Sequence, residues 1–126
     1  MVKLVFCCRR RPEMTVEDFH HYWLESHGPL VRSLRSSFPG MRRYVQSHTI
    51  ATPVNDALRA SRGAGEPYDG ITEVWLDDLE SLGTTQEALE AGQRLLEDER
   101  TFLDLSRSSL LSPSNTTSSD HPIRCQ

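Results

Sequence analysis

The chain has 126 residues and a net charge of −4 at pH 7, which suits one domain with a core of its own. This acidic balance argues against a nucleic-acid partner, because phosphate binding needs a concentrated basic face. The three cysteines, Cys7, Cys8 and Cys125, have neither metal-ligand spacing nor the pattern of a disulfide framework. No apolar stretch approaches the about 20 residues of a membrane span, so we expect a cytoplasmic protein without a membrane segment.

The first third of the chain predicts a strand followed by a long amphipathic helix. Residues 2–8 are apolar and rich in β formers, which is typical of a central strand. Thr15 then suits a helix N-cap, because its hydroxyl can accept a hydrogen bond from an unpaired amide of the first turn. Apolar residues recur at three-four spacing from 15 to 34, so we expect one helix against the core, bent where Gly28 precedes Pro29.

Two histidines, His20 and His27, fall inside the apolar stripe of this helix. They are separated by about 10 Å along the helix axis, so they are more readily separate groups than one metal site. A buried imidazole needs a hydrogen-bond partner or a cavity that holds water. The stripe is therefore the place to look for chemistry.

Two further strands are predicted from β-branched and aromatic content, over residues 41–50 and 70–76. In the first, Tyr44 and His48 project from the same side, with a glutamine between them, which is unusual for a plain apolar core. In the second, Trp75 shares a face with an isoleucine and a glutamate.

Helical signals reappear in the second half of the chain. The connection 51–70 can start a short helix at Pro53, and loops of this length are usually functional lids or disordered. Thr84 with Glu87 forms a capping box for a last helix, in which Gly92 marks a break.

Residues 109–111 are the candidate for a fourth strand, and the polar segment 112–126 reads as a disordered tail beyond a domain of residues 1–111. The order strand, helix, strand, strand, helix, strand predicts an α+β fold, the ferredoxin-like βαββαβ sandwich, with helices on one face of an antiparallel sheet. The other face would leave apolar side chains in water unless a second subunit covers it, so we expect a homodimer.

Three segments carry a resemblance to a known family: HYWLESHGPLV at 21–31, RRYVQSH at 42–48 and YDGITEVW at 68–75. With them, residues 2–111 resemble the EthD family of small proteins. The resemblance implies a dimeric α+β barrel built from ferredoxin-like protomers. Relatives with that fold include cofactor-independent decarboxylases, dehydratases, cyclases and monooxygenases acting on polyketide-type aromatic compounds. The motif histidine corresponds to His27 here, with Trp23 and Pro29 flanking it.

The resulting hypothesis is a pocket beneath the long helix, with acid and base groups from His27, His48 and Tyr44. Aromatic and histidine side chains would bind the substrate, namely Phe6, His20, Trp23 and Trp75. His27 could instead have a structural role at the helix bend. Tyr44 and His48 could instead face the dimer partner or solvent, and Trp75 could belong to the plain core.

We therefore expect an enzyme of specialised, polyketide-type metabolism that moves protons on a carbonyl-activated aromatic substrate, giving dehydration, decarboxylation or cyclisation. Residues 51–70 would close over the pocket. No motif supports an organic cofactor. A metal site is a weaker hypothesis, built from two of the histidines with a carboxylate such as Asp69 or Glu73. A cofactor-free monooxygenase or a non-catalytic binder of an apolar metabolite would also suit such a pocket.

Overall fold

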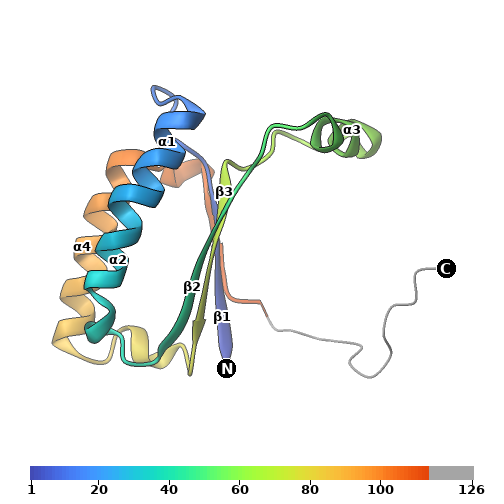
Figure 1. The fold of residues 1–126 in the computed structure, drawn as a ribbon. Coiled ribbons are helices and arrows are strands. Elements are labelled where there is room, and N and C mark those ends of the chain that lie inside the picture. The colour runs from blue at the N-terminus through green and yellow to red at the C-terminus, as the bar shows by residue number, and fades with distance from the viewer. Residues whose placement is uncertain (114–126) are drawn as a thin grey trace, which may run out of the picture.

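Helices cover one face of a four-stranded antiparallel sheet, and residues 1–113 leave the other face open (Figure 1). In this computed structural model, which describes residues 1–113, the strand order is β2-β3-β1-β4. The strands are β1 (Val2–Cys8), β2 (Met41–His48), β3 (Gly70–Leu76) and β4 (Ser109–Leu111). The predicted α+β, ferredoxin-like fold is confirmed, including the short fourth strand beside β1.

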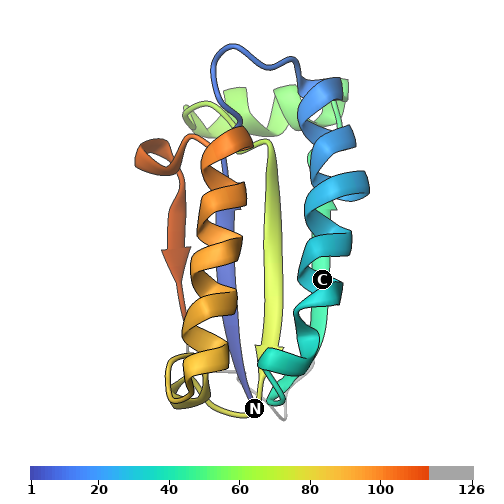
Figure 2. The same cartoon turned by 90° about the vertical axis from the view of Figure 1, so that its left-hand side faces the viewer.

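The helical layer consists of two antiparallel rods that lie side by side on the sheet (Figure 2). One rod is continuous from α1 (Val16–Tyr22) through a π-helical turn (Trp23–His27) into α2 (Gly28–Ser33), and the other is α4 (Gln86–Phe102). As predicted, the Thr15 hydroxyl caps α1, accepting from the Asp18 amide at 3.1 Å.

The irregularity in the first rod begins upstream of the predicted bend. The Gly28 amide donates to the Trp23 carbonyl, five residues back, and Pro29 has no amide hydrogen with which to continue an α-helical pattern. The hydrogen-bonded loop before the proline therefore contains one residue more than that of an α-helix. This π-helical turn ends at His27.

The core lies between the helices and the even-numbered side of β1. One buried cluster combines Cys8, Phe19, Trp23, Phe102 and Leu103, and a second joins Phe38 to Ala88 and Ala91. Gly70 shows how closely the layers meet, since a Cβ atom there would lie 2.2 Å from Cζ3 of the Trp23 indole. No larger residue fits at that position without moving the indole.

Two details of the last helix differ from the sequence prediction. Its N-cap is Thr85, whose hydroxyl accepts from the Ala88 amide at 3.0 Å, and not Thr84. The helix also runs through Gly92 without a break. A single helical glycine costs about 1 kcal/mol relative to alanine, which the packing of the buried face of α4 can outweigh.

The connection between β2 and β3 contains α3 (Pro53–Arg62), which projects beyond the end of the sheet, away from the helical layer (Figure 1). The predicted start at Pro53 is confirmed, with Thr52 as its N-cap. Gly63 ends the helix with a left-handed φ of 58°. Of the predicted tail 112–126, residues 114–126 lie outside the described part. Within residues 1–113, no helix combines the length and apolar character that crossing a bilayer requires.

Candidate functional site

A cavity of about 180 Å³ lies between the helical layer and the sheet. Its wall is mostly apolar and includes the predicted Phe6 and Trp23. Four titratable side chains from different elements also line it: Cys8 from β1, His27 from the π-helical turn, Tyr44 from β2 and Glu99 from α4. An apolar hollow with a few polar groups is typical of a small-molecule site.

His27 is held by a carboxylate that the sequence analysis did not identify. Its side chain is almost fully buried, and its Nδ1 lies 2.7 Å from Oδ2 of Asp98. Because an ionised carboxylate only accepts hydrogen bonds, Nδ1 carries the proton and Nε2 keeps its lone pair. Burial lowers the pKa of His27, and the hydrogen bond and charge of Asp98 offset part of that shift. The imidazole is therefore neutral at pH 7, with Nε2 available as a base.

Asp98 accepts a second hydrogen bond, which fixes the orientation of its carboxylate. The Tyr22 hydroxyl donates to Oδ1 of Asp98, so the two carboxylate oxygens each accept one hydrogen bond. The hydrogen bond to Asp98 also raises the pKa of Tyr22, which keeps the phenol protonated. This arrangement holds the imidazole in one tautomer and one orientation.

Glu99 is the acidic group of the cavity wall. Burial, with a smaller contribution from the Asp98 charge, raises the pKa of Glu99 to about 7. The side chain makes no hydrogen bond to any residue within 1–113. Near neutral pH a large fraction of this carboxyl group is therefore protonated and able to donate a proton.

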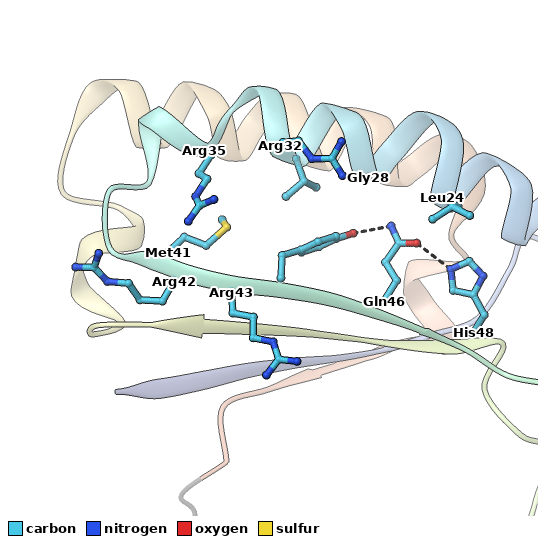
Figure 3. Close-up of a pocket in the computed structure, with 11 residues that line it drawn as sticks. Leu24, Gly28, Arg32, Arg35, Met41, Arg42, Arg43, Gln46 and His48 are labelled. Carbon is cyan, nitrogen blue, oxygen red and sulfur yellow. Dashed lines mark hydrogen bonds between the residues drawn. The ribbon is translucent and has the colours of Figure 1, made fainter.

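Tyr44 is connected to His48 through Gln46, whose contact with His48 is drawn in Figure 3. The Gln46 amide nitrogen donates to the Trp23 carbonyl and to the Tyr44 hydroxyl, both at 2.8 Å. A carbonyl oxygen only accepts hydrogen bonds, so the contact with Trp23 fixes the orientation of the Gln46 amide. The Gln46 oxygen then points to His48 and accepts a hydrogen bond from its Nε2, at 2.8 Å. Burial raises the pKa of Tyr44 to about 12, so the phenol is neutral and keeps its own proton to donate.

His48 lines a second hollow, a groove of about 350 Å³ between the first helical rod and β2 (Figure 3). Its ring stacks on the Trp23 indole at a centroid distance of 4.5 Å. The prediction that His27 and His48 share one cavity is therefore wrong. Tyr44 belongs to the walls of both hollows, together with Val31 and Met41.

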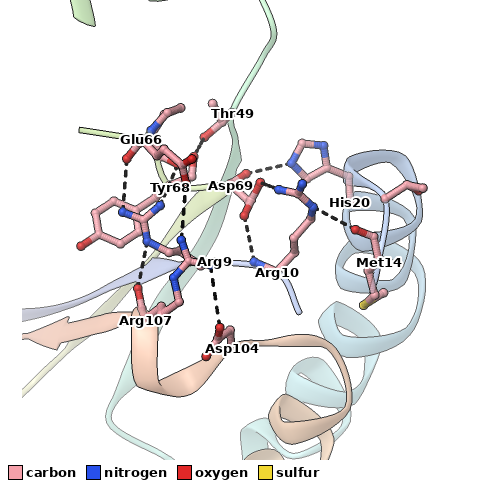
Figure 4. Close-up of polar contacts among 12 residues, drawn as sticks. Arg9, Arg10, Met14, His20, Thr49, Glu66, Tyr68, Asp69, Asp104 and Arg107 are labelled. Carbon is pink, nitrogen blue, oxygen red and sulfur yellow. Dashed lines mark hydrogen bonds and ion pairs between the residues drawn. The ribbon is translucent and has the colours of Figure 1, made fainter. Parts of the chain in front are cut away.

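His20 and Trp75 lie outside both hollows. Nε2 of His20 is 2.8 Å from the Asp69 carbonyl oxygen, at a polar junction where Asp69 also binds Arg10 (Figure 4). His20 contacts the His48 ring, at a centroid distance of 4.6 Å, but lines neither hollow.

Trp75 projects from the open face of the sheet, where Lys3 and Arg43 flank its ring. Its predicted place in the pocket is therefore wrong, because strand alternation turns it away from the helices. Residues 51–70 contribute no side chain to the cavity or the groove, so the predicted lid does not cover either.

The sequence analysis missed Asp98 and Glu99 as site residues. One available signal was an acidic residue at the spacing of the apolar stripe in the last helix, with Glu99 four residues after Leu95 and three before Phe102. Asp98 had no such signal, since its role depends on how two helices meet. Within residues 1–113, no group of three or more histidine, cysteine or acidic side chains is arranged to hold a metal ion.

This fold and site define a class of protein. Its members would be ferredoxin-like α+β domains with a histidine–carboxylate pair beneath the first helix. The chain belongs to the EthD domain family, whose family model matches residues 11–106. The chain is also similar to dehydratase CTB10 of Cercospora beticola, with 27% identity over 105 residues that cover 79% of this chain and 77% of that protein.

Solved structures support the same fold. An EthD family protein from Bacillus halodurans matches with a TM-score of 0.58 and 20% identity, covering 92% of this chain and all (100%) of that one. A dimeric ferredoxin-like protein of unknown function from Thermobifida fusca matches with a TM-score of 0.58 and 11% identity, covering 90% of each chain. A dimeric protein of unknown function from Bacteroides fragilis matches with a TM-score of 0.56 and 14% identity, covering 90% of this chain and 95% of that one.

Proposed function

We propose that this chain is a dehydratase-type lyase of secondary metabolism, acting on a carbonyl-activated, polyketide-type aromatic substrate. The observation that carries the proposal is the cavity in which neutral His27, held by Asp98, faces the same space as Glu99. Two groups whose environments leave one as a base and the other as an acid near pH 7 are the pair that an elimination needs. The similarity to a protein named as a dehydratase supports this choice among the lyase reactions.

The proposed reaction removes water from a β-hydroxy carbonyl compound. Nε2 of His27 takes the proton from the carbon next to the carbonyl, which gives an enolate that the Tyr44 hydroxyl stabilises by donating a hydrogen bond. The enolate electrons then form the new C=C bond while the C–O bond at the β-carbon breaks. Glu99 donates its proton to the departing hydroxyl, which leaves as water. Proton transfer from His27 back to Glu99 resets both groups.

The proposed enzyme works as a homodimer through the open face of its sheet. That face carries apolar side chains with much of their surface in solvent, such as Ile71, 38% exposed, and Leu111, 47% exposed. Two of the similar solved structures are dimeric proteins. Sedimentation equilibrium tests this, and an Ile71→Glu variant should shift the chain toward monomer.

The activity test uses a panel of aromatic β-hydroxy ketones, with loss of one water followed by mass spectrometry. We expect turnover by the wild type and a loss of at least about 10²-fold in kcat/KM in His27→Gln, because that variant lacks the base. His21→Gln is the matched control, since His21 is exposed on the same helical rod and should leave turnover unchanged.

Two results would contradict the proposal. One is turnover in His27→Gln close to that of the wild type, with circular dichroism showing both proteins folded. The other is binding of the panel without any water loss, which would favour a carrier of apolar metabolites. Oxygen consumption with substrate present would instead point to a monooxygenase.

A further inference from the structure

The cavity around His27 is too small to enclose a polyketide-type substrate by itself. Its volume is about 180 Å³, whereas sites for small organic ligands usually measure roughly 300–1,000 Å³. The neighbouring groove adds about 350 Å³ and shares three wall side chains with the cavity, those of Val31, Met41 and Tyr44. A ligand of the size that the proposed function requires would therefore extend past Tyr44 into the groove.

The helical side of the groove is basic in a chain that is acidic as a whole. Four arginines, Arg32, Arg35, Arg42 and Arg43, and no carboxylate are among its lining residues, although the net charge of the chain is −4. The Arg43 guanidinium points to the other face of the sheet, so its charge does not lie in the groove (Figure 3). Local charge of this kind sets which ligands a hollow attracts, irrespective of net charge.

Two of these arginines already have partners. Arg42 makes a bidentate ion pair with Asp77, and Arg43 stacks over the Trp75 ring on the open face of the sheet. The guanidinium groups of Arg32 and Arg35, on the helical side of the groove (Figure 3), form no ion pair or hydrogen bond with any residue from 1 to 113. Guanidinium groups in such a position are suited to a planar or tetrahedral anion, which they bind through charge-assisted hydrogen bonds.

We propose that the substrate of this site carries a carboxylate or phosphate group, which Arg32 and Arg35 bind in the groove while the apolar body of the same molecule enters the His27 cavity. This inference rests on the proposed function for the identity of the cavity and adds the chemical class of the substrate. Tyr44 stands between the two ends, and its hydroxyl, which accepts from Gln46, retains a hydrogen to donate to the middle of the ligand.

The test is calorimetric binding of three probes with one aromatic body: naphthoate, naphthyl phosphate and the neutral naphthalenemethanol. We expect the wild type to bind at least one anion about 10-fold more tightly than the alcohol, and to lose most of that preference at high salt. Comparison of the two anions separates a carboxylate from a phosphate group. The Arg32→Gln/Arg35→Gln double variant should lose the preference and bind the alcohol within about twofold of wild type, which also shows that its cavity is intact.

Arg59→Gln/Arg62→Gln is the matched control, because it removes the same charge from exposed positions on α3, outside the groove. Equal binding of anions and alcohol by the wild type overturns the inference, as does an anion preference that survives the Arg32/Arg35 change. Failure of both anions to bind overturns it too. These measurements involve no turnover, so an inactive but anion-selective protein would refute the proposed reaction and leave the groove assignment standing.

Discussion

Replacing Glu99 by glutamine should stabilise the protein at alkaline pH while impairing the proposed reaction. Burial raises the pKa of Glu99 from its ordinary value of 4.5 to about 7, so the folded state holds a proton that the unfolded chain releases. A carboxyl group with a raised folded pKa costs stability as the pH rises from the unfolded value through the folded value, and above that the cost is complete. Glutamine keeps the shape of the protonated acid and carries no charge to bury.

The size of the effect follows from the shift. One pKa unit corresponds to about 1.4 kcal/mol, so the shift sets an upper bound of about 3 kcal/mol. Because the side chain is only partly buried, solvent screening reduces this, and we expect about 2 kcal/mol in favour of Glu99→Gln near pH 8. Below about pH 4 the two proteins should have nearly equal free energies of unfolding, because Glu99 is then largely protonated in the unfolded chain as well as in the folded state.

Urea unfolding followed by circular dichroism at about pH 4 and pH 8 measures both free energies. Glu97→Gln is the matched control, since Glu97 is exposed on the same helix and should show no such pH-dependent gain. A Glu99→Gln variant no more stable than wild type near pH 8 would refute the reasoning. So would a gain of the same size at both pH values, because titration could not produce it.

Three further substitutions test the packing and the polar contacts. Gly70→Ala should cost about 3 kcal/mol in urea unfolding, because its Cβ would lie 2.2 Å from the Trp23 indole. Gly92→Ala should stabilise the protein by about 0.5–1 kcal/mol in the same assay, since an added Cβ in this unbroken helix would meet nothing within 4 Å beyond the backbone of its own helix and the adjoining residues. Tyr22→Phe removes a donor from the carboxylate that holds His27, and NMR titration should show a higher pKa for His27 because that carboxylate keeps more of its charge.

Each of these has a clear contrary result. Gly65→Ala is the control for Gly70→Ala, since nothing lies within 4 Å of a Cβ there, and equal effects of the two would contradict the close contact. Loss of stability in Gly92→Ala would indicate a real break in α4. An unchanged or lower pKa of His27 in Tyr22→Phe would show that the phenol does not compete for the carboxylate.

The periodicity of apolar residues was enough to predict the main helices and strands and the inward direction of the His27 side chain. Apolar spacing of three and four residues places Trp23 and His27 on one face, and both are buried in the structure. Strand alternation separated Tyr44 and His48 from Val45 and Ser47, and both do face the helical side, lining hollows beneath the first rod. These inferences needed only local geometry.

The prediction of a shared cavity failed because of tertiary packing. The Trp23 indole belongs to the cavity wall and also stacks on the His48 ring, at a centroid distance of 4.5 Å. His48 therefore meets the indole and lines the groove, and not the cavity that contains His27.

The positions of Trp75 and Asp98 could not be predicted from any single helix or strand. Alternation assigns Trp75 to one of two faces, but the register that pairs it with Lys3 decides which face is covered by helices. Asp98 reaches His27 only because α4 lies beside the first rod, a relation of tertiary packing.

The most direct test of the site is the protonation of His27, observed by nitrogen NMR of labelled imidazoles at about pH 7, with and without naphthoate. The account predicts a neutral ring protonated at Nδ1, with an unprotonated Nε2 whose resonance moves when the probe binds. A doubly protonated ring, a proton on Nε2, or a resonance that the bound probe leaves unchanged would contradict a base that faces the ligand.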